Sequence, residues 1–401
     1  MPFQTETSPL LETDHLLPDL VALRRSLHST PEVGLHLPET QRTILAALEG
    51  LPLEISLGKG LSSIVAVLRG DYGGPTVLLR GDMDALPVQE NTGLAYAATN
   101  GNMHACGHDL HTAGLVGAAK LLSGLKSELH GSVIFMFQPG EEGYGGAKKM
   151  IEEGVLEATG ERPIAAYGLH VAPGPRGTFM YRSGPALAGA SELNIKVHGK
   201  GGHGSRPESA IDPVPALVKI AGSLQEMLAS KFPTFDPVVL TVTQLKAGEA
   251  INVIPATAEL GATVRTLSFE ANERLRIHTK ALAEGIAASF GCTAEIEWHV
   301  SYPVTVNHPD ETAEAATSLK KHFGHERVVE SAEPAMGSED FSEVLQRVPG
   351  TFFFLGTSPP EVDFEKAAWN HSPEVLFDDA VLGDQAAALA LLAMRKLTPS
   401  G

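Results

Sequence analysis

The chain has 401 residues and a formal net charge of -18 at pH 7, because 48 Asp and Glu side chains outnumber 30 Lys and Arg side chains. This acidic balance argues against nucleic acid or an anionic membrane surface as a partner, since both bind basic patches. We find no run of about 18 apolar residues, so we expect no membrane-spanning helix. The length is sufficient for a large core and for two domains.

The cysteines and the N-terminus bear on where the protein works. The sequence contains two cysteines, Cys106 and Cys292, so we expect no disulfide framework and a reducing compartment. Residues 1–20 are polar and contain prolines. They lack the basic start and apolar core of a secretion signal. We therefore expect a cytoplasmic protein.

The first part of the chain alternates between helical and strand-like segments. Apolar residues recur at helical spacing in 19–27, 38–48 and 113–122, and short apolar runs rich in β-branched residues occupy 63–68, 76–79 and 132–137. The same rhythm resumes after residue 310, with a helix at 311–322, a strand at 351–355 and a helix at 379–396. This alternation predicts α/β layers around a buried, largely parallel sheet.

The middle of the chain has a different rhythm. It predicts the order strand, helix, strand, strand, helix, strand, at 192–197, 213–228, 238–245, 257–266, 270–288 and 293–300. This order is typical of a ferredoxin-like α+β sandwich. We therefore expect this segment to be a separate domain inserted into the first. The predicted domains are a discontinuous one at 1–186 and 300–401 and an inserted one at 187–299.

Potential metal ligands and carboxylates follow four of the apolar strands. They are Asp82 and Asp84, Glu141 and Glu142, His170, and Asn370 with His371. Ligands of open α/β sheets bind outside the carboxyl ends of the strands. Four strand ends that all carry such side chains predict a metal site at that edge.

The segment HACGHDLH at 104–111 adds a thiol, imidazoles and a carboxylate just before a predicted helix. This combination suits a divalent transition ion such as zinc, manganese, cobalt or nickel. The alternative is a helix N-terminus that Asp109 caps, with incidental histidines.

Adjacent glutamates such as Glu141 and Glu142 usually form a solvated surface pair. Here they follow an apolar strand through Pro139 and Gly140, which suggests the mouth of a cleft. Amide hydrolysis at a metal needs one carboxylate to hold the ion and another to accept a proton from the attacking water. Neighbouring residues at a strand end can point in different directions, so one pair could serve both roles.

Six motifs in this order resemble those of the aminoacylase/carboxypeptidase family of dinuclear metallohydrolases. They are RGDMDALP (80–87), HACGHD (104–109), FQPGEE (137–142), GKGGHG (199–204), NVIP (252–255) and GSEDF (337–341). The resemblance runs from about residue 15 to the C-terminus. It is strongest to the amidohydrolase branch, which includes hippurate hydrolases and auxin-conjugate hydrolases. The resemblance implies a catalytic three-layer α/β domain with a mixed sheet and an inserted lid and dimerisation domain.

The resemblance also implies roles for individual residues. The ligands of two divalent metal ions, manganese or zinc with cobalt or nickel possible, would be Cys106, His108, Glu142, His170 and His371. Glu141 matches the general acid/base, and Asp84 matches a carboxylate that orients a neighbouring ligand. Asp82 stands where more distant relatives carry a metal-binding histidine. Because this branch uses the cysteine instead, Asp82 is not expected to be a ligand.

Three residues of the inserted domain match substrate-binding positions. His203 matches a histidine that reaches the active site of a partner subunit and binds the scissile carbonyl, which implies a homodimer or a larger homo-oligomer formed through the lid domain. Asn252 and Arg265 match residues that hold the substrate's carbonyl or carboxylate. From the residues alone, His203 would be a turn histidine in a glycine-rich loop and Arg265 a solvated strand residue.

The resulting expectation is a metal-dependent amidohydrolase that acts on N-acyl amino acids or similar small N-acyl conjugates. A carboxypeptidase or dipeptidase keeps the same chemistry with a different substrate. Two further alternatives are a non-catalytic ligand-binding protein and a thiol enzyme with Cys106 as nucleophile and His108 or His111 as base. The sequence does not specify the acyl group or the amino acid.

Overall fold

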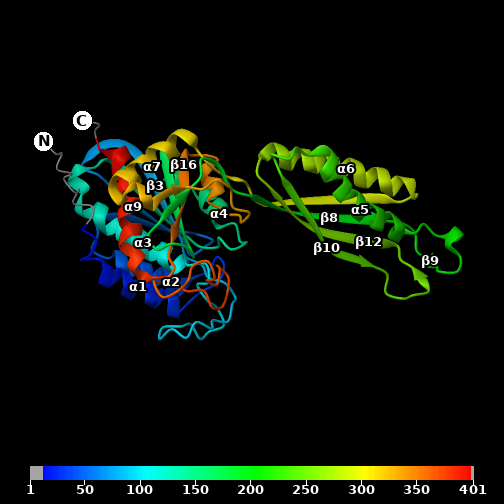
Figure 1. Ribbon diagram of the computed structural model, residues 1–401, viewed down its shortest axis with the longest axis horizontal. Helices are drawn as coiled ribbons and strands as arrows, with labels where there is room; N and C mark the ends of the chain where they lie inside the picture. Colours follow the sequence, from blue (N-terminus) through cyan, green and yellow to red (C-terminus); the bar gives the residue numbers. More distant parts are fainter. Residues whose placement is uncertain (1–11, 399–401) are drawn as a thin grey trace. The chain divides into compact units, whose positions relative to one another are not determined.

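The structure is a computed structural model that describes residues 12–398. The chain divides into two compact units (Figure 1). The first consists of Met1–Ala186, Val306–Glu333 and Asp340–Gly401, and the second of Leu187–Thr305 and Pro334–Glu339. Residues 1–11, which belong to the segment where we expected no secretion signal, lie outside the described residues.

The first unit contains a mixed sheet, which within the described residues has eight strands in the order β1-β2-β4-β3-β5-β16-β6-β15. The pairs β3–β4, β3–β5 and β5–β16 are parallel, whereas β1–β2, β2–β4 and β16–β6 are antiparallel. The sheet is therefore parallel at its centre and mixed toward its edges. Its strands are β1 (Leu53–Leu57), β2 (Ile64–Arg69), β3 (Tyr72–Asp82), β4 (His130–Gln138), β5 (Ala165–Ala172), β6 (Phe179–Tyr181), β15 (Val328–Glu330) and β16 (Gly350–Gly356).

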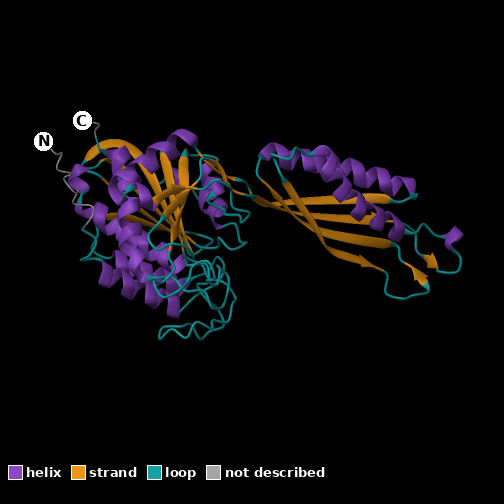
Figure 2. Ribbon diagram, viewed as in Figure 1, coloured by secondary structure: helices purple, strands orange, loops and turns teal. Residues whose placement is uncertain are grey.

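Helices cover this sheet (Figure 2). Helices α3 and α9 pack against each other and against β3 and β5, and α4 packs against β4 and α8. The helices of this unit are α1 (Leu17–Ser29), α2 (Pro38–Leu48), α3 (His108–Gly124), α4 (Gly146–Glu152), α7 (Pro309–Phe323), α8 (Ser342–Leu345) and α9 (Leu382–Leu397). The α/β architecture predicted from the sequence is confirmed.

The central strands form because their side chains are apolar on both faces, as expected of a sheet covered by helices. The Val133–Phe137 segment of β4 is fully buried. In the parallel pairing of β3 with β4, Val77 lies opposite Val133 and Asp82 opposite Gln138. The two strands therefore end at the same edge of the sheet, and the carboxylates that follow them start from neighbouring positions.

The second unit is a four-stranded antiparallel sheet in the order β10-β12-β8-β13, with helices α5 and α6 packed on it. Along the chain the order is β8 (Gly189–His198), α5 (Pro213–Lys231), β10 (Val238–Ala247), β12 (Thr257–Thr266), α6 (Phe269–Ser289) and β13 (Thr293–Tyr302). This is the predicted ferredoxin-like arrangement. The unit extends to Thr305, past its predicted end at residue 299, because β13 continues to Tyr302.

The structure adds elements that the sequence pattern did not indicate. Strands β9 (Gly202–His203) and β11 (Val253–Ile254) pair in a short two-stranded sheet, and β7 (Gly184–Leu187) pairs with β14 (Thr305–Asn307). These strands are too short to show a period of two. Within residues 12–398, no helix is both long enough and apolar enough to cross a membrane.

Candidate metal centre

Cys106 lies at the centre of the predicted ligands. Its Sγ is 3.2 Å from Nε2 of His371 and 3.4 Å from Nε2 of His170. Two groups of potential ligand atoms, each within 4.8 Å of one another, contain this sulfur. They are Cys106 with His108 and His170, and Cys106 with Glu142 and His371. The five predicted ligands therefore come together, in two groups that share the sulfur of Cys106.

Both ring nitrogens of His108 are buried without a hydrogen bond to a described residue. The carboxylates of Asp82 and Asp84 lie 3.5 Å from Nε2 and Nδ1 of His108, respectively. Buried polar groups are normally satisfied, so these atoms indicate a missing partner such as a metal ion. Thiolate, imidazole and carboxylate donors fit a divalent transition ion.

Two of the histidines differ in their electrostatics. His170 donates its Nδ1 proton to the backbone oxygen of Val171 at 2.7 Å, which leaves Nε2 as the lone-pair atom. Burial and the neighbouring His111 hold the pKa of His170 well below its ordinary value. In contrast, hydrogen bonds to Cys106 and Glu142 raise the pKa of His371 to about 10. Without metal, His371 is therefore protonated at neutral pH.

Asp84 orients the two glutamates. Its carboxylate oxygens accept the backbone N–H groups of Glu141 and Glu142, at 3.0 and 3.1 Å, and the side chain is buried. Ligand atoms of Glu141, Glu142 and His108 lie within 4.8 Å of one another. The turn after β4 thus places both glutamates beside the cluster, with Glu141 buried.

Asp82 also forms a close group with His108 and His111, but its partners are protein groups. It pairs with Nη1 of Arg80 at 2.7 Å and with Nδ1 of His111 at 2.5 Å. Nε2 of His111 accepts the N–H of Val171 at 2.8 Å, so the ring proton lies on Nδ1 and points to Asp82. Both nitrogens of His111 are therefore engaged by protein groups.

Gly107 makes the turn between Cys106 and His108. It has φ +81, and a Cβ atom there would lie 2.3 Å from Cγ2 of Val171. Both the left-handed conformation and the lack of space favour glycine. The side chain of Asp109 does not cap the helix, because the N-cap position belongs to Gly107 and no side chain bonds there.

A buried charge network behind the cluster was not found from the sequence. Asp109 pairs with Nε of Arg24 at 2.8 Å and with Nδ1 of His28 at 2.7 Å, and His28 also contacts Glu90 at 3.1 Å. Burial would raise the pKa of Asp109, but Arg24 and His28 overcome this effect and hold it well below its ordinary value. The available signal was a basic pair four residues apart in an amphipathic helix.

His203 and Asn252 lie together in the second unit. His203 pairs with Val253 across the β9–β11 ladder, and Gly204 donates its N–H to the backbone oxygen of Asn252 at 2.8 Å. The exposed ring of His203 accepts the N–H of Ser205 at Nδ1, at 3.1 Å. Its proton therefore lies on Nε2. Arg265 lies on β12 of the other sheet, where its guanidinium contacts Thr263 and the backbone oxygen of Val264.

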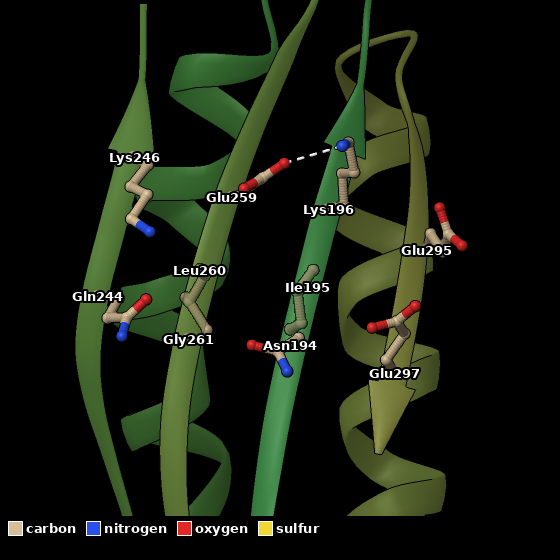
Figure 3. Close-up of a pocket in the computed structure, with 10 residues that line it drawn as sticks. All are labelled: Asn194, Ile195, Lys196, Gln244, Lys246, Glu259, Leu260, Gly261, Glu295 and Glu297. Atoms are coloured by element: carbon tan, nitrogen blue, oxygen red, sulfur yellow. Dashed lines mark ion pairs between the residues drawn. The ribbon is translucent and has the colours of Figure 1, made fainter. Parts of the chain in front are cut away.

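The open face of the four-stranded sheet carries a polar hollow that contains none of the predicted site residues. Figure 3 shows its side chains on neighbouring strands, with Lys196 and Glu259 joined by an ion pair of 2.8 Å. Its polar lining residues are amides, acids and lysines, and neither histidine nor cysteine lines it. The predicted metal ligands of the first unit lie around Cys106 instead.

Comparison with known proteins gives consistent matches. A model of the peptidase family M20/M25/M40 matches residues 78–395. The chain is 38% identical over 385 residues to thermostable carboxypeptidase 1 of Saccharolobus solfataricus. This alignment covers 94% of this chain and 95% of that protein. The chain is also 37% identical over 365 residues to N-acetylcysteine deacetylase of Bacillus subtilis. That alignment covers 90% of this chain and 93% of the deacetylase.

A solved structure is also similar. The crystal structure of a dinuclear metal-binding peptidase of the M20 family from Bacillus subtilis aligns with a TM-score of 0.82 and 35% identity. The alignment covers 96% of this chain and 99% of that one. The similarity therefore extends over both units and over all the predicted site residues.

Proposed function

This chain belongs to the peptidase family M20/M25/M40, and we propose that it cleaves the amide bond of N-acyl amino acids or similar small N-acyl conjugates, with Glu141 as general acid and base. It is a hydrolase that acts on amide bonds. The observation that carries the proposal is the position of Cys106 in two ligand groups, with the buried carboxylate of Glu141 beside them.

The residues that would hold two divalent ions are Cys106, His108, Glu142, His170 and His371. We propose manganese or zinc, with cobalt or nickel as alternatives, because thiolate, imidazole and carboxylate ligands suit these ions. When bound, such ions lower the pKa of water and polarise the amide carbonyl. Two unpaired cysteines also support a cytoplasmic location.

Glu141 moves the proton in this proposal. Oε1 of Glu142 lies 3.0 Å from Nε2 of His371, and Glu142 belongs to the ligand group of Cys106. We therefore assign metal binding to Glu142 and acid and base chemistry to Glu141, the role that its motif implies. Its carboxylate accepts a proton from the attacking water and then gives it to the leaving amine nitrogen. Asp84 fixes the backbone of the turn on which both glutamates stand.

His203 supplies the electrophilic hydrogen bond in this proposal. With Nδ1 occupied by the N–H of Ser205, its Nε2–H is free to donate to the oxygen on which negative charge develops. We propose that His203 acts in the site of a partner subunit, in a homodimer formed through the second unit. Asn252 would bind the substrate beside it, and Arg265 would bind the substrate's carboxylate.

A carboxypeptidase or dipeptidase is the second candidate, supported by the 38% identity to a thermostable carboxypeptidase. A thiol enzyme that uses His111 as its base is disfavoured because the nitrogens of His111 are engaged by Asp82 and by the N–H of Val171. A single assay separates the candidates, namely amine release from N-acetyl amino acids, N-benzoyl amino acids and dipeptides, with metal and with a chelator. Chelator-sensitive cleavage of the N-acyl amino acids supports the proposal, and cleavage of dipeptides alone supports the second candidate.

A further inference from the structure

Asn370 connects three ligand-bearing segments of the candidate metal centre. Its Nδ2 is 3.1 Å from the backbone oxygen of Val171, 3.3 Å from the backbone oxygen of Cys106 and 3.7 Å from Sγ of Cys106. The two carbonyl oxygens only accept hydrogen bonds, so this end of the amide must be the NH₂ group. The orientation of the side chain is therefore fixed by chemistry.

The backbone next to Asn370 is also fixed by a hydrogen bond. The N–H of His371 donates to the oxygen of Ala105 at 2.8 Å. Among residues 12–398, His371 is the only non-glycine residue with a positive φ, which is 72°. Such a conformation persists when its surroundings fix it. The hydrogen bonds of Asn370 and of the His371 N–H attach this loop to the segment that carries Cys106.

From these contacts we propose that Asn370 is a positioning residue that donates an N–H···S hydrogen bond to the Cys106 thiolate and fixes His371 for metal binding. The inference rests on the proposed function. The imidazole nitrogens of His170 and His371 beside Sγ belong to proposed ligands. When those nitrogens bind metal, Asn370 remains as a donor to the sulfur. Its two N–H protons serve three acceptors, so the sulfur shares one N–H with a carbonyl oxygen.

Such a bond has a measurable consequence. An N–H donor stabilises the sulfur lone pairs, and loss of the donor raises their energy. In a cobalt-loaded protein, the thiolate-to-cobalt charge-transfer band would then move to lower energy. Partners of ligands also tune affinity, and their loss typically weakens metal binding about 10-fold to 100-fold.

The test uses the full-length protein loaded with cobalt(II) and compares the wild type with Asn370→Ala. We expect the charge-transfer band of the variant to shift to longer wavelength and its cobalt dissociation constant to rise about 10-fold or more. Asn91→Ala is the matched control, because the Asn91 amide donates to Glu374 at 3.1 Å in the neighbouring loop and contacts no proposed ligand. The control is expected to keep the wild-type band and affinity.

If Asn370→Ala does not fold, Asn370→Leu provides the same test, because it keeps a similar volume and removes the N–H donors without adding a charge. Wild-type band position and affinity in a folded Asn370 variant would overturn the role of this residue. A wild-type protein that shows no thiolate-to-cobalt band would instead count against the proposed metal centre itself. Neither readout requires turnover, so the two failures are distinguishable.

Discussion

Cys106 Sγ lies 3.2 Å from Nε2 of His371, although the two residues are 265 positions apart in the chain. The topology explains this contact. Strand β16 pairs with β5 in parallel, with Phe354 opposite His170, and the loop after β16 returns to the segment before α3, where His371 donates its N–H to Ala105. The first and last parts of the first unit therefore build one site, and the ligands depend on the whole unit being folded.

The adjacent glutamates provide a direct test of the division of roles. We expect Glu141→Gln to retain both metal ions and to lower kcat by about 10²-fold to 10⁴-fold, since the amide cannot accept the proton. Glu142→Gln is the matched comparison and should lose metal as well as activity. Metal content by mass spectrometry and turnover on the preferred N-acyl amino acid measure both effects. A metal-loaded Glu141→Gln protein with wild-type turnover would exclude the proposed role.

Metal binding is expected to release protons. In the metal-free protein the pKa of His371 is about 10, raised by its hydrogen bonds to Cys106 and Glu142, so the ring carries a proton at pH 7. A metal ion needs the lone pair of Nε2, and the proton must leave. Affinity should therefore increase as the pH rises from 7 toward 10, and the release from His371 should decrease over the same range. Calorimetry at pH 7 in buffers of different ionisation enthalpy measures the number released. Binding without proton release would contradict the assignment of His371 as a ligand.

The buried network behind the cluster should dominate the stability of the first unit. Arg24→Ala leaves the carboxylate of Asp109 buried without its arginine, and breaking a buried pair in this way costs about 3–5 kcal/mol. The thermal midpoint should fall by roughly 6 °C or more, at about 2 °C per kcal/mol. Arg25→Ala is the control, because Arg25 is half exposed and pairs with Asp379 near the surface, where a pair contributes about 0–1 kcal/mol. Equal midpoints for the two variants would show that the network has no such role.

The contacts of this buried network could not be predicted from the sequence, in contrast to the central strands. The central strands could be predicted because runs such as Val133–Phe137 are apolar on both faces. A metal site could be predicted because carboxylates and histidines follow several strand ends, whereas the ligand set came from the resemblance of the motifs to a known family. The partner of Asp109 could not be predicted, because Arg24 lies 85 positions before it and no local sequence feature selects one arginine over another. The edge strand β1 alternates apolar and polar residues (LEISL), yet nearly all its residues are exposed, so this alternation does not indicate a buried face.

The proton position on His203 is another feature that only the fold reveals. It depends on the N–H of Ser205, a backbone group without a sequence signature. The five ligand candidates and Glu141 came from motifs whose order in the chain is informative, whereas the tautomer of a ring comes from its hydrogen bonds. Local geometry of this kind requires coordinates.

If His203 acts in a partner's site, two inactive variants should restore activity when they are combined. Glu141→Gln removes the base but keeps His203, and His203→Ala removes the donor but keeps Glu141. In a mixed dimer, the subunit with Glu141 receives His203 from its partner and has one complete site. We expect each variant alone to be at least about 10²-fold less active than the wild type. After denaturation and joint refolding, a random mixture that forms dimers should recover roughly a quarter of wild-type activity, because half of the dimers are mixed and each has one intact site of two. Separately refolded samples mixed afterwards are the control and should remain inactive over the assay. A joint refolding that forms dimers but yields no activity would place the action of His203 within its own subunit.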